Sequence, residues 1–346
     1  MVSEKSPKPT IADVARVAGV SVTTVSRVLN GEKYVRDKKK AAVDKAVAKL
    51  GYQPNVFARS LAGDRSYLIG LLFDDPRGDY LSGMQRGAMK RSKEAGLHVV
   101  VELFDERASL DEIESFLSKL KLAGAILTPP VCDKPVLLAA LDKFKVPTVR
   151  ISPGTKHPGM PSIKIDDYAA AKLMTEHLIS LGHKDIGFIV GDPDHADAQE
   201  RLLAFRDTMD AAGQRVKEEW IAQGYYQFDT GVDAAIGILR QSHRPSAIFA
   251  SNDDMAAAAI VVADRMGLQV PSDLSIAGFD DIPLASAVSP PLTTIRQPVE
   301  EMAVEAVSKL IAMRNGEDTD TETQLVMPVS FVERTSTAAA PKRSAS

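Results

Sequence analysis

Residues 10–31 read TIADVARVAGVSVTTVSRVLNG, and this stretch decides the architecture of the N-terminal part of the chain. Apolar residues recur at helical spacing on both sides of Gly19, which breaks the pattern. Thr10 followed by Asp13 is a capping-box-like start for the first helix. A third amphipathic segment lies at about 37–50. Three short helices with a tight turn between the first two predict a helix-turn-helix.

The second helix of this motif, residues 22–29, is the part that we expect to meet DNA. In a helix-turn-helix this helix lies in the major groove, so its solvent face needs small polar or hydrogen-bonding side chains. Arg27 can reach a guanine edge or a phosphate, and Val22 can touch a thymine methyl group. Ser21 and Thr24 can bind phosphates through hydroxyl and backbone N–H groups. The predicted contacts of this helix are Ser21, Val22, Thr23, Thr24, Ser26 and Arg27.

The charge of the chain is divided unevenly along its length. Residues 1–65 hold 13 Lys and Arg against 6 Asp and Glu, a local net of +7. The whole chain of 346 residues has a net charge of −4, which leaves −11 (−4 less +7) for residues 66–346. A basic head on an acidic body suggests that the head meets a polyanion. A generic three-helix bundle with a polar face is the alternative, and it leaves this charge unexplained.

Composition excludes several classes of protein. Hydrophobic residues make up 45% and charged residues 25%, which is typical of a globular chain and excludes disorder throughout. The one cysteine, Cys132, excludes an internal disulfide and a cysteine-based metal cluster. No apolar run approaches the ~20 residues that span a bilayer, and the N-terminus lacks the apolar core of a secretory signal. We therefore expect a cytoplasmic protein without membrane association.

Enzyme classes find no support in the motifs. The sequence has no GxGxxG, GxxxxGK(S/T), GxSxG or HExxH pattern. The histidines form no close pair that would suit a metal, and His183 is expected to be structural. We predict that the chain is not an enzyme and that it has no metal site and no cofactor.

From residue 67 onward, apolar runs alternate with longer amphipathic segments. Continuous apolar strands separated by helices indicate parallel sheets with both faces covered. A polar loop at about 151–162 divides the series, which predicts an α/β body of two doubly wound lobes. The expected strands are 67–73, 98–103, 124–128, 147–151, 185–190, 246–250 and 274–279, and the expected helices include 82–95, 111–121, 168–181 and 198–212.

Polar residues directly follow several of the predicted strands. Ligands of open α/β folds collect at the carboxyl ends of strands, and carboxylate and amide groups suit the hydroxyls of a sugar. The same side chains can instead cap the helices that follow, and this alternative stays open. The residues concerned are Asp74, Asp75, Asn252, Asp253, Asp280 and Asp281.

Several longer motifs occur in order along the chain. Residues 10–75 contain VAxxAGVSxxTVSRVLNG, LGYxPN and ARSLAGxRSxLIG, and they are followed by LISLGHKDIGFIVG (178–191), AIFASNDDMAAAAI (247–260), VPSDLSIAGFDDIP (270–283) and PPLTTIRQP (290–298). Together these motifs resemble the LacI/GalR family of bacterial transcription regulators over essentially all of residues 10–334. The resemblance implies an N-terminal helix-turn-helix domain, a hinge helix and a two-lobed body like that of periplasmic sugar-binding proteins, used as a homodimer.

The resemblance also implies a function. We expect a sequence-specific DNA-binding regulator, namely a repressor of carbohydrate-metabolism genes whose operator affinity is controlled by a small sugar-like effector. The expected operator is a double-stranded pseudo-palindrome with a central CpG step. The alternative is a small-molecule (sugar) binding protein of the periplasmic type without a transcriptional role. Such a protein would carry a signal peptide where this chain has a basic helix-turn-helix.

The family's DNA-contacting positions carry over to this sequence residue by residue. Val22 and Thr23 match base-reading positions, and Tyr34 matches a backbone-contacting position. Leu61 matches the hinge leucine that wedges into the minor groove, although an ordinary core leucine is the alternative. Phe57 and Ala58 would face the partner's hinge helix. The full predicted DNA-binding set is Thr10, Ser21, Val22, Thr23, Thr24, Ser26, Arg27, Asn30, Tyr34, Asn55 and Leu61.

The effector site carries over in the same way. Arg201 matches the family's effector-binding arginine, Tyr226 its stacking aromatic residue, and Asn252 and Asp280 its hydroxyl-binding residues. Ser152 stands where several sugar-responsive members carry Asp, so the identity of the effector stays open. The full predicted effector set is Asp74, Tyr80, Ser152, Arg201, Tyr226, Asn252 and Asp280.

The predicted domain boundaries follow from these landmarks. The chain is expected to cross between the lobes, and a ligand between them would change their relative angle and thereby the pairing of the hinge helices. The tail has no leucine heptad, so no tetramerising module is expected. The expected parts are a DNA-binding domain (1–53), a hinge helix and linker (54–65), a first lobe (66–165 and 297–325), a second lobe (166–296 and 326–336) and a disordered tail (337–346).

Overall fold

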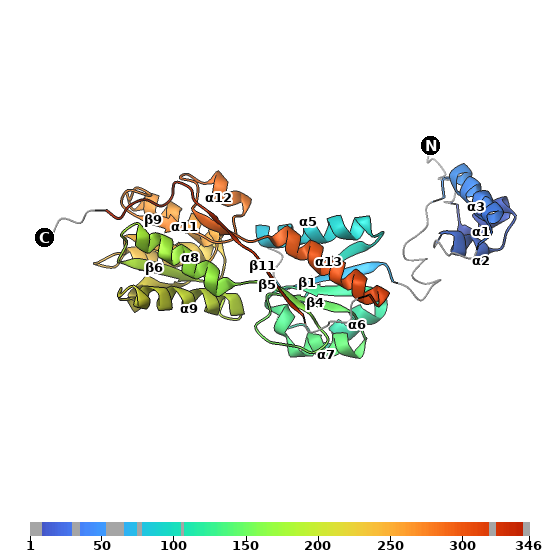
Figure 1. Cartoon of the computed structure of the whole chain (residues 1–346), viewed down its shortest axis with the longest axis horizontal. Helices are drawn as coiled ribbons and strands as arrows, with labels where there is room; N and C mark the ends of the chain where they lie inside the picture. The colour runs from blue at the N-terminus through green and yellow to red at the C-terminus, as the bar shows by residue number, and fades with distance from the viewer. Residues whose placement is uncertain are drawn as a thin grey trace, which may run out of the picture. The chain divides into compact units, whose positions relative to one another are not determined.

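The computed structural model describes residues 9–29, 35–52, 66–74, 78–104, 107–317 and 323–341. The chain divides into two compact units, Met1–Tyr67 and Leu68–Ser346, and each is described by itself (Figure 1). Six predicted site residues lie outside the described residues, namely Asn30, Tyr34, Asn55, Phe57, Ala58 and Leu61.

The N-terminal unit contains three helices, α1 (Ile11–Ala18), α2 (Val22–Leu29) and α3 (Asp37–Leu50). The capping box at the start of α1 is confirmed, because Thr10 and Asp13 each accept a hydrogen bond from the other's backbone N–H. Gly19 ends α1 in the left-handed conformation (φ 67°), which glycine adopts at no steric cost. The small core that holds the helices together consists of Val14, Ala15, Val25, Val28, Val43 and Ala46.

The first lobe of the larger unit is built on a sheet with the strand order β11-β5-β4-β3-β1-β2, in which every pair is parallel. Its central strands are buried along their whole length, as expected when helices cover both faces. The strands are β1 (Leu68–Phe73), β2 (His98–Leu103), β3 (Gly124–Leu127), β4 (Thr148–Ile151), β5 (Ser162–Ile165) and β11 (Gln324–Met327).

Helices α5 (Asp79–Glu94) and α13 (Val299–Asn315) lie side by side against this sheet, although they are far apart in the sequence (Figure 1). Gly87 allows the close approach, because an added Cβ there would collide with the backbone of Glu300 and with Ala303. The other helical segments of this lobe are α6 (Leu110–Leu120), η1 (Val131–Asp133) and α7 (Pro135–Lys143).

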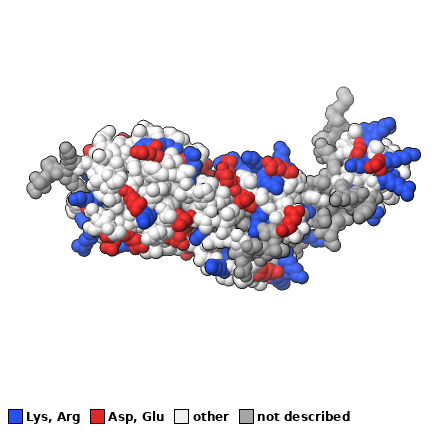
Figure 2. All heavy atoms as spheres, viewed as in Figure 1, with Lys and Arg blue, Asp and Glu red and all other residues white. Residues whose placement is uncertain are grey.

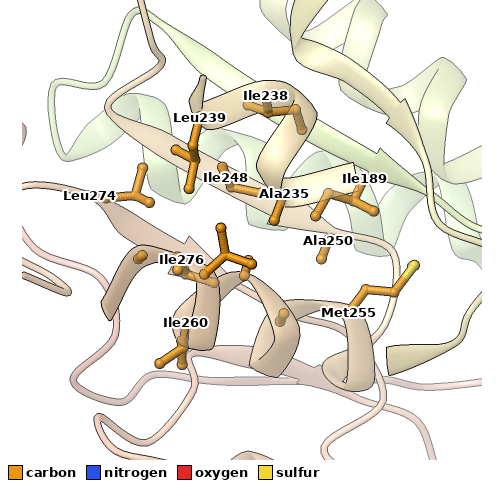
Figure 3. Packing of buried hydrophobic residues seen from close by; sticks show 14 of the residues in the cluster. Ile189, Ala235, Ile238, Leu239, Ile248, Ala250, Met255, Ile260, Leu274 and Ile276 are labelled. Carbon is orange, nitrogen blue, oxygen red and sulfur yellow. The ribbon is translucent and has the colours of Figure 1, made fainter. Parts of the chain in front are cut away.

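The second lobe has a parallel sheet of four strands in the order β7-β6-β8-β9. Its core is aliphatic, and residues such as Ile248 and Ile276 pack against the alanine-rich face of α11 (Asp253–Arg265), as Figure 3 shows. The strands are β6 (Ile186–Val190), β7 (Ile221–Gln223), β8 (Ala247–Ala250) and β9 (Ser275–Ala277). The remaining helical segments are α8 (Asp167–Ser180), α9 (Ala196–Ala211), η2 (Glu218–Trp220), α10 (Phe228–Leu239) and α12 (Pro283–Ala287).

The chain passes between the two lobes at three places. It crosses from β5 to α8, returns from β10 (Thr294–Arg296) to α13, and crosses again from β11 to β12 (Ser330–Val332). β10 and β12 pair antiparallel, which ties the last two crossings together. The body therefore has two lobes joined by several adjacent strands.

All seven strands predicted from apolar runs are confirmed, with ends that agree to within about two residues. The structure adds β5, β7, β10, β11 and β12, which the sequence analysis did not identify. Each of these strands includes at least one half-buried or exposed residue, whereas β9, which is equally short and is predicted by the apolar run at 274–279, is buried throughout.

The prediction of a disordered tail from residue 337 is wrong for residues 337–341, which bond to the second lobe. The Thr337 hydroxyl bonds to His177 (3.1 Å), the Ala338 carbonyl accepts from His183 (3.0 Å), and the Ala340 N–H donates to the Leu181 carbonyl (2.9 Å). These polar groups are satisfied by the second lobe, so the segment is fixed to its surface. His183 is structural, as predicted, because its other ring nitrogen bonds to the hydroxyl of Ser246.

Candidate functional site

One face of α2 is exposed and polar, and the other holds the helix in the core. Val25 and Val28 are buried, whereas Val22 (44% exposed), Thr23 and Arg27 lie at the surface. This division matches what a recognition helix needs, since the exposed side chains can reach base edges.

The hydroxyls at the start of α2 have local partners. Ser21 Oγ accepts from the Thr24 N–H (3.2 Å) and bonds to the Thr24 hydroxyl (2.9 Å), so Ser21 caps the helix. Ser26 is half-buried, and Thr10 is exposed at the start of α1. These contacts fix the first turn of α2, where backbone N–H groups are available to an anion.

Basic side chains surround the helices of this unit. Lys38, Lys39 and Lys40 stand exposed at the start of α3, and Lys45 and Lys49 follow along it. Figure 2 shows lysine and arginine gathered on the visible face of this unit. The unit therefore presents a positively charged surface to a polyanion.

A cavity of about 180 Å³ lies between the two lobes of the body. It is lined at the carboxyl ends of parallel strands, by Asp74 after β1, Thr128 after β3, Asp192 after β6, Asn252 after β8 and Asp280 after β9. Because both sheets contribute strand ends, a ligand held here would touch both lobes.

Arg201 of α9 is the buried charged centre of this cavity. It is 2% exposed, and its Nε and Nη2 contact Asp167 Oδ1 at 2.9 and 2.8 Å. Its Nη1 donates to the Ser251 carbonyl at 2.7 Å, and its Nη2 lies 3.4 Å from Asp197. The guanidinium also stacks on the Phe279 ring, 3.7 Å from the ring centroid. These partners fix the arginine at the cavity wall.

Asp280 lies beside Arg201 in an unusual backbone conformation. Its φ is 107°, a region that non-glycine residues rarely adopt and that recurs at functional sites. Its Oδ1 accepts from Gln297 at 2.7 Å and lies 4.0 Å from Arg201 Nη1. Burial raises the pKa of Asp280 to about 7 despite the nearby arginine, and burial likewise raises the pKa of Asp167 to about 6. The cavity therefore holds carboxylates that are costly to keep charged.

Asn252 and Asp253 have clear structural roles. Asn252 Oδ1 accepts from the Met255 N–H and caps α11, while its Nδ2 donates to the Tyr226 carbonyl (both 3.0 Å). Asp253 is buried and accepts from the Ile282 N–H and the Thr294 hydroxyl. Asn252 therefore caps a helix, which is the alternative role considered for residues at strand ends, and it also lines the cavity.

Two consecutive tyrosines in left-handed conformations border the cavity. Tyr225 and Tyr226 have φ of 53° and 60°. The Tyr226 hydroxyl donates to Asp197 at 3.2 Å, and its ring lies against Gly191. Together with Tyr80 from the first lobe, these rings give the cavity apolar faces next to its carboxylates.

Six of the seven predicted effector residues line this cavity, and Ser152 does not. Ser152 is buried at the end of β4, where its N–H donates to the Ile163 carbonyl. The loop that follows is held by Asp133, which accepts from the N–H groups of Gly154 (2.7 Å) and Thr155 (3.2 Å). Ser152 therefore does not border the cavity described here.

The sequence analysis missed several lining residues, namely Asp192, His195, Asp197, Tyr225, Gln227, Asp254 and Gln297. Asp192 follows the apolar run of β6, so the rule that identified Asp280 would have found it. Asp197 stands one helical turn before Arg201, a spacing at which charged side chains meet.

Two further features of the described residues bear on the functional class. No group of three or more His, Cys, Asp or Glu among them could hold a metal ion. Within the same part of the chain, no helix is long and apolar enough to cross a membrane.

Gly191→Ala is expected to weaken ligand binding at least tenfold without loss of operator affinity. An added methyl group would occupy the place of the Tyr226 ring and push it into the cavity. The measurement is the ligand-induced shift in melting temperature for the small molecule, from a screened panel, that shifts the wild type most. Gly237→Ala is the matched control, because nothing lies near that position and alanine favours the helix. Equal shifts for both variants would contradict the role assigned to Tyr226.

Comparison with known proteins agrees with this architecture. Residues 10–55 match the lacI family of bacterial regulatory proteins, and residues 175–337 match the periplasmic binding protein-like domain. The chain is 34% identical to the HTH-type transcriptional regulator DegA of Bacillus subtilis, over 95% of this chain and 98% of that protein. It is also 34% identical to the transcriptional repressor PurR of Pectobacterium carotovorum, over 96% and 98% of the two chains.

Solved structures agree as well. The Lac repressor dimer bound to operator and the anti-inducer ONPF matches with a TM-score of 0.82 and 28% identity, over 96% of this chain and 100% of that one. The regulator CelR in complex with cellobiose matches with a TM-score of 0.73 and 30% identity, over 95% and 99%. These relatives are regulators of transcription. The chain belongs to the LacI family of bacterial regulatory proteins and is a DNA-binding regulator of transcription.

Proposed function

We propose that this regulator is a homodimeric repressor, working in the cytoplasm, that releases its operator when a small carbohydrate-like effector binds between the lobes of its body. The observation that carries the proposal is the cavity lined by both lobes in the same chain as an exposed recognition helix. The helix-turn-helix match disfavours the alternative, a periplasmic binding protein without a transcriptional role.

The carbohydrate-like effector rests on the chemistry of the cavity. Carboxylates such as Asp280 accept hydrogen bonds from hydroxyl groups, and Tyr226 offers a ring on which a sugar can stack. The structure of CelR contains cellobiose, which supports a sugar as the effector. The name of the repressor PurR mentions no sugar. The lining residues therefore favour a polyhydroxylated ligand.

The coupling between ligand and DNA follows from the way the chain is connected. The chain enters the body through residues 66–68, directly into β1 of the first lobe, so the DNA-binding head is attached to that lobe. A ligand that grips both lobes favours one arrangement over another, and it can shift DNA affinity only by that difference. The predicted hinge helix, with Asn55, Phe57, Ala58 and Leu61, is the segment whose pairing in the dimer would respond. We assign the minor-groove wedge at a central CpG step to Leu61.

Arg27→Ala is expected to weaken operator binding by about 1–3 kcal/mol, because Arg27 is exposed on the recognition face of α2. Exchanges at Val22 and Thr23 should instead change which bases are preferred. The measurement is a fluorescence titration against pseudo-palindromic duplexes of ~20 base pairs, two half-sites one turn apart. Unrelated duplexes of the same length serve as the control.

The affinity of the wild type should also fall steeply with salt, because phosphate contacts release counterions. If Arg27→Ala binds the operator as tightly as the wild type does, α2 is not the recognition helix. An affinity that is insensitive to salt would contradict the proposed role of the basic head.

The effector proposal is tested on the same duplexes. A sugar that raises the melting temperature of the full chain should also lower its operator affinity, since it binds one lobe arrangement preferentially. A sugar that binds tightly and leaves operator affinity unchanged would contradict the control mechanism.

A further inference from the structure

The two lobes touch where the loop after β4 meets the start of α9. Gly154 belongs to this loop in the first lobe, and Ala196 is the first residue of α9 in the second lobe. A Cβ atom added to Gly154 would lie 2.6 Å from the Cβ atom of Ala196, which is closer than real Cβ atoms approach their neighbours. Gly154 does not adopt a positive φ, so its backbone would accept another residue. Glycine is therefore needed here for the narrow space between the lobes and not for the turn.

A buried ion pair fixes this loop in place. Arg150 is 1% exposed and donates to Asp133 Oδ1 at 2.5 Å and to the Cys132 carbonyl at 2.7 Å. It also donates to the Thr155 carbonyl at 3.0 Å. Asp133 in turn accepts from the N–H groups of Gly154 and Thr155. Because a buried ion pair is costly to break, a larger residue at position 154 would displace the start of α9 and not the loop.

The contact adjoins the cavity between the lobes. Ala196 lies between His195 and Asp197, and both of these residues line the cavity. The first lobe contributes Asp74 and Tyr80 to the same lining. Moving the start of α9 away from the first lobe would separate these two parts of the wall. The contact between Gly154 and Ala196 therefore belongs to the enclosed arrangement, by which we mean the lobe arrangement in which one ligand can touch both lobes.

We propose that Gly154 is a positioning residue for the response to effector, because its contact with Ala196 stabilises the enclosed arrangement and so sets how readily the operator is released. The inference rests on the proposed function, in which the effector favours the enclosed arrangement and the operator favours another. A contact shifts this equilibrium only if it differs between the two arrangements, and this one is made only where the loop meets α9. Changing the contact therefore changes operator affinity even without an effector.

Gly154→Ala is expected to disfavour the enclosed arrangement and to raise operator affinity by up to roughly tenfold, since overpacking of one methyl group is unfavourable by about that factor. The readout is a fluorescence titration of the full chain against the pseudo-palindromic duplex that the wild type binds most tightly. Ala196→Gly removes the opposing Cβ atom, so adding it to Gly154→Ala should restore the wild-type affinity. Gly237→Ala is the matched control, because a methyl group added there meets nothing.

A disulfide between the same two positions shifts the equilibrium in the opposite direction. Gly154→Cys and Ala196→Cys are combined with Cys132→Ala, which removes the one native thiol of the chain. Cβ atoms joined by a disulfide are about 3.8 Å apart, so the oxidised protein keeps the loop and α9 in contact. It should bind the operator duplex up to roughly tenfold more weakly than the same protein after reduction. Gly154→Cys with Cys132→Ala is the control, whose affinity should not change on reduction.

These two proteins shift the equilibrium in opposite directions, so at least one of them must change operator affinity whichever arrangement predominates in the wild type. The inference is overturned if the disulfide does not form, if neither protein changes operator affinity, or if Ala196→Gly does not restore an affinity that Gly154→Ala has changed. Changes of reversed sign would support the role of the contact and contradict release of the operator by effector. Failure of the proposed function is therefore distinguishable from failure of the inference. Circular dichroism establishes that each variant is folded.

Discussion

Arg201→Ala is expected to lower the free energy of unfolding of the body by about 3–5 kcal/mol and to abolish its response to effector. Arg201 is buried among Asp167, Asp197 and Asp280, so its removal leaves buried carboxylates without their counter-charge. The loss should appear in urea denaturation followed by the fluorescence of Trp220. That residue is the one tryptophan of the chain and lies in the core of the second lobe.

The control for this substitution lies on the same helix. Arg206 of α9 pairs with Glu218 at the surface, and exposed pairs of this kind contribute less than about 1 kcal/mol. The free energy of unfolding of Arg206→Ala should therefore be close to that of the wild type. If Arg201→Ala is no less stable than Arg206→Ala, the buried cluster does not stabilise the fold in the way described.

Asp280→Asn is expected to stabilise the protein above pH 7 by a few kcal/mol and to lose this advantage under acidic conditions. The pKa of Asp280 is raised from 3.8 to about 7 in the folded protein. A raised pKa means that the folded state binds the proton more tightly than the unfolded state, so stability is lost as the pH rises through about 7. A tenfold difference in proton affinity between the two states corresponds to about 1.4 kcal/mol, and asparagine removes the cost because it is never charged.

The measurement compares unfolding of the wild type and the variant across this pH range. Other groups titrate in the same window, since burial lowers the pKa of His177 and His183 from 6.5 and their protonation destabilises the fold at lower pH. Both histidines are present in both proteins, so the difference between the two isolates Asp280. A difference that does not change with pH would contradict the raised pKa.

Much of the fold could be predicted from the sequence because its strong elements have strong patterns. The apolar runs of β1, β6 and β8 are buried along their whole length, and such strands stand out between amphipathic helices. The strands β7, β10 and β12 each include half-buried or exposed residues, so they lack the continuous apolar run that predicts the equally short β9.

The candidate site was predictable where a side chain follows a recognisable strand, as Asp74 and Asp280 do. Ser152 also follows a strand, but it is buried outside the cavity lining, and the next loop bonds to Asp133, a contact between segments that sequence spacing cannot show.

Helix α13 and strand β11 lie late in the sequence, although they belong to the first lobe. Their position determines the order in which the two lobes can fold during synthesis. The four strands of the second lobe lie between residues 186 and 277 and emerge from the ribosome as one continuous segment. The first lobe is completed later in synthesis. Helix α13, which covers α5, begins at residue 299, and β11, which extends the sheet, begins at residue 324. Until then the apolar face of α5 is uncovered, so a chain cut before residue 299 exposes that face to aggregation during synthesis.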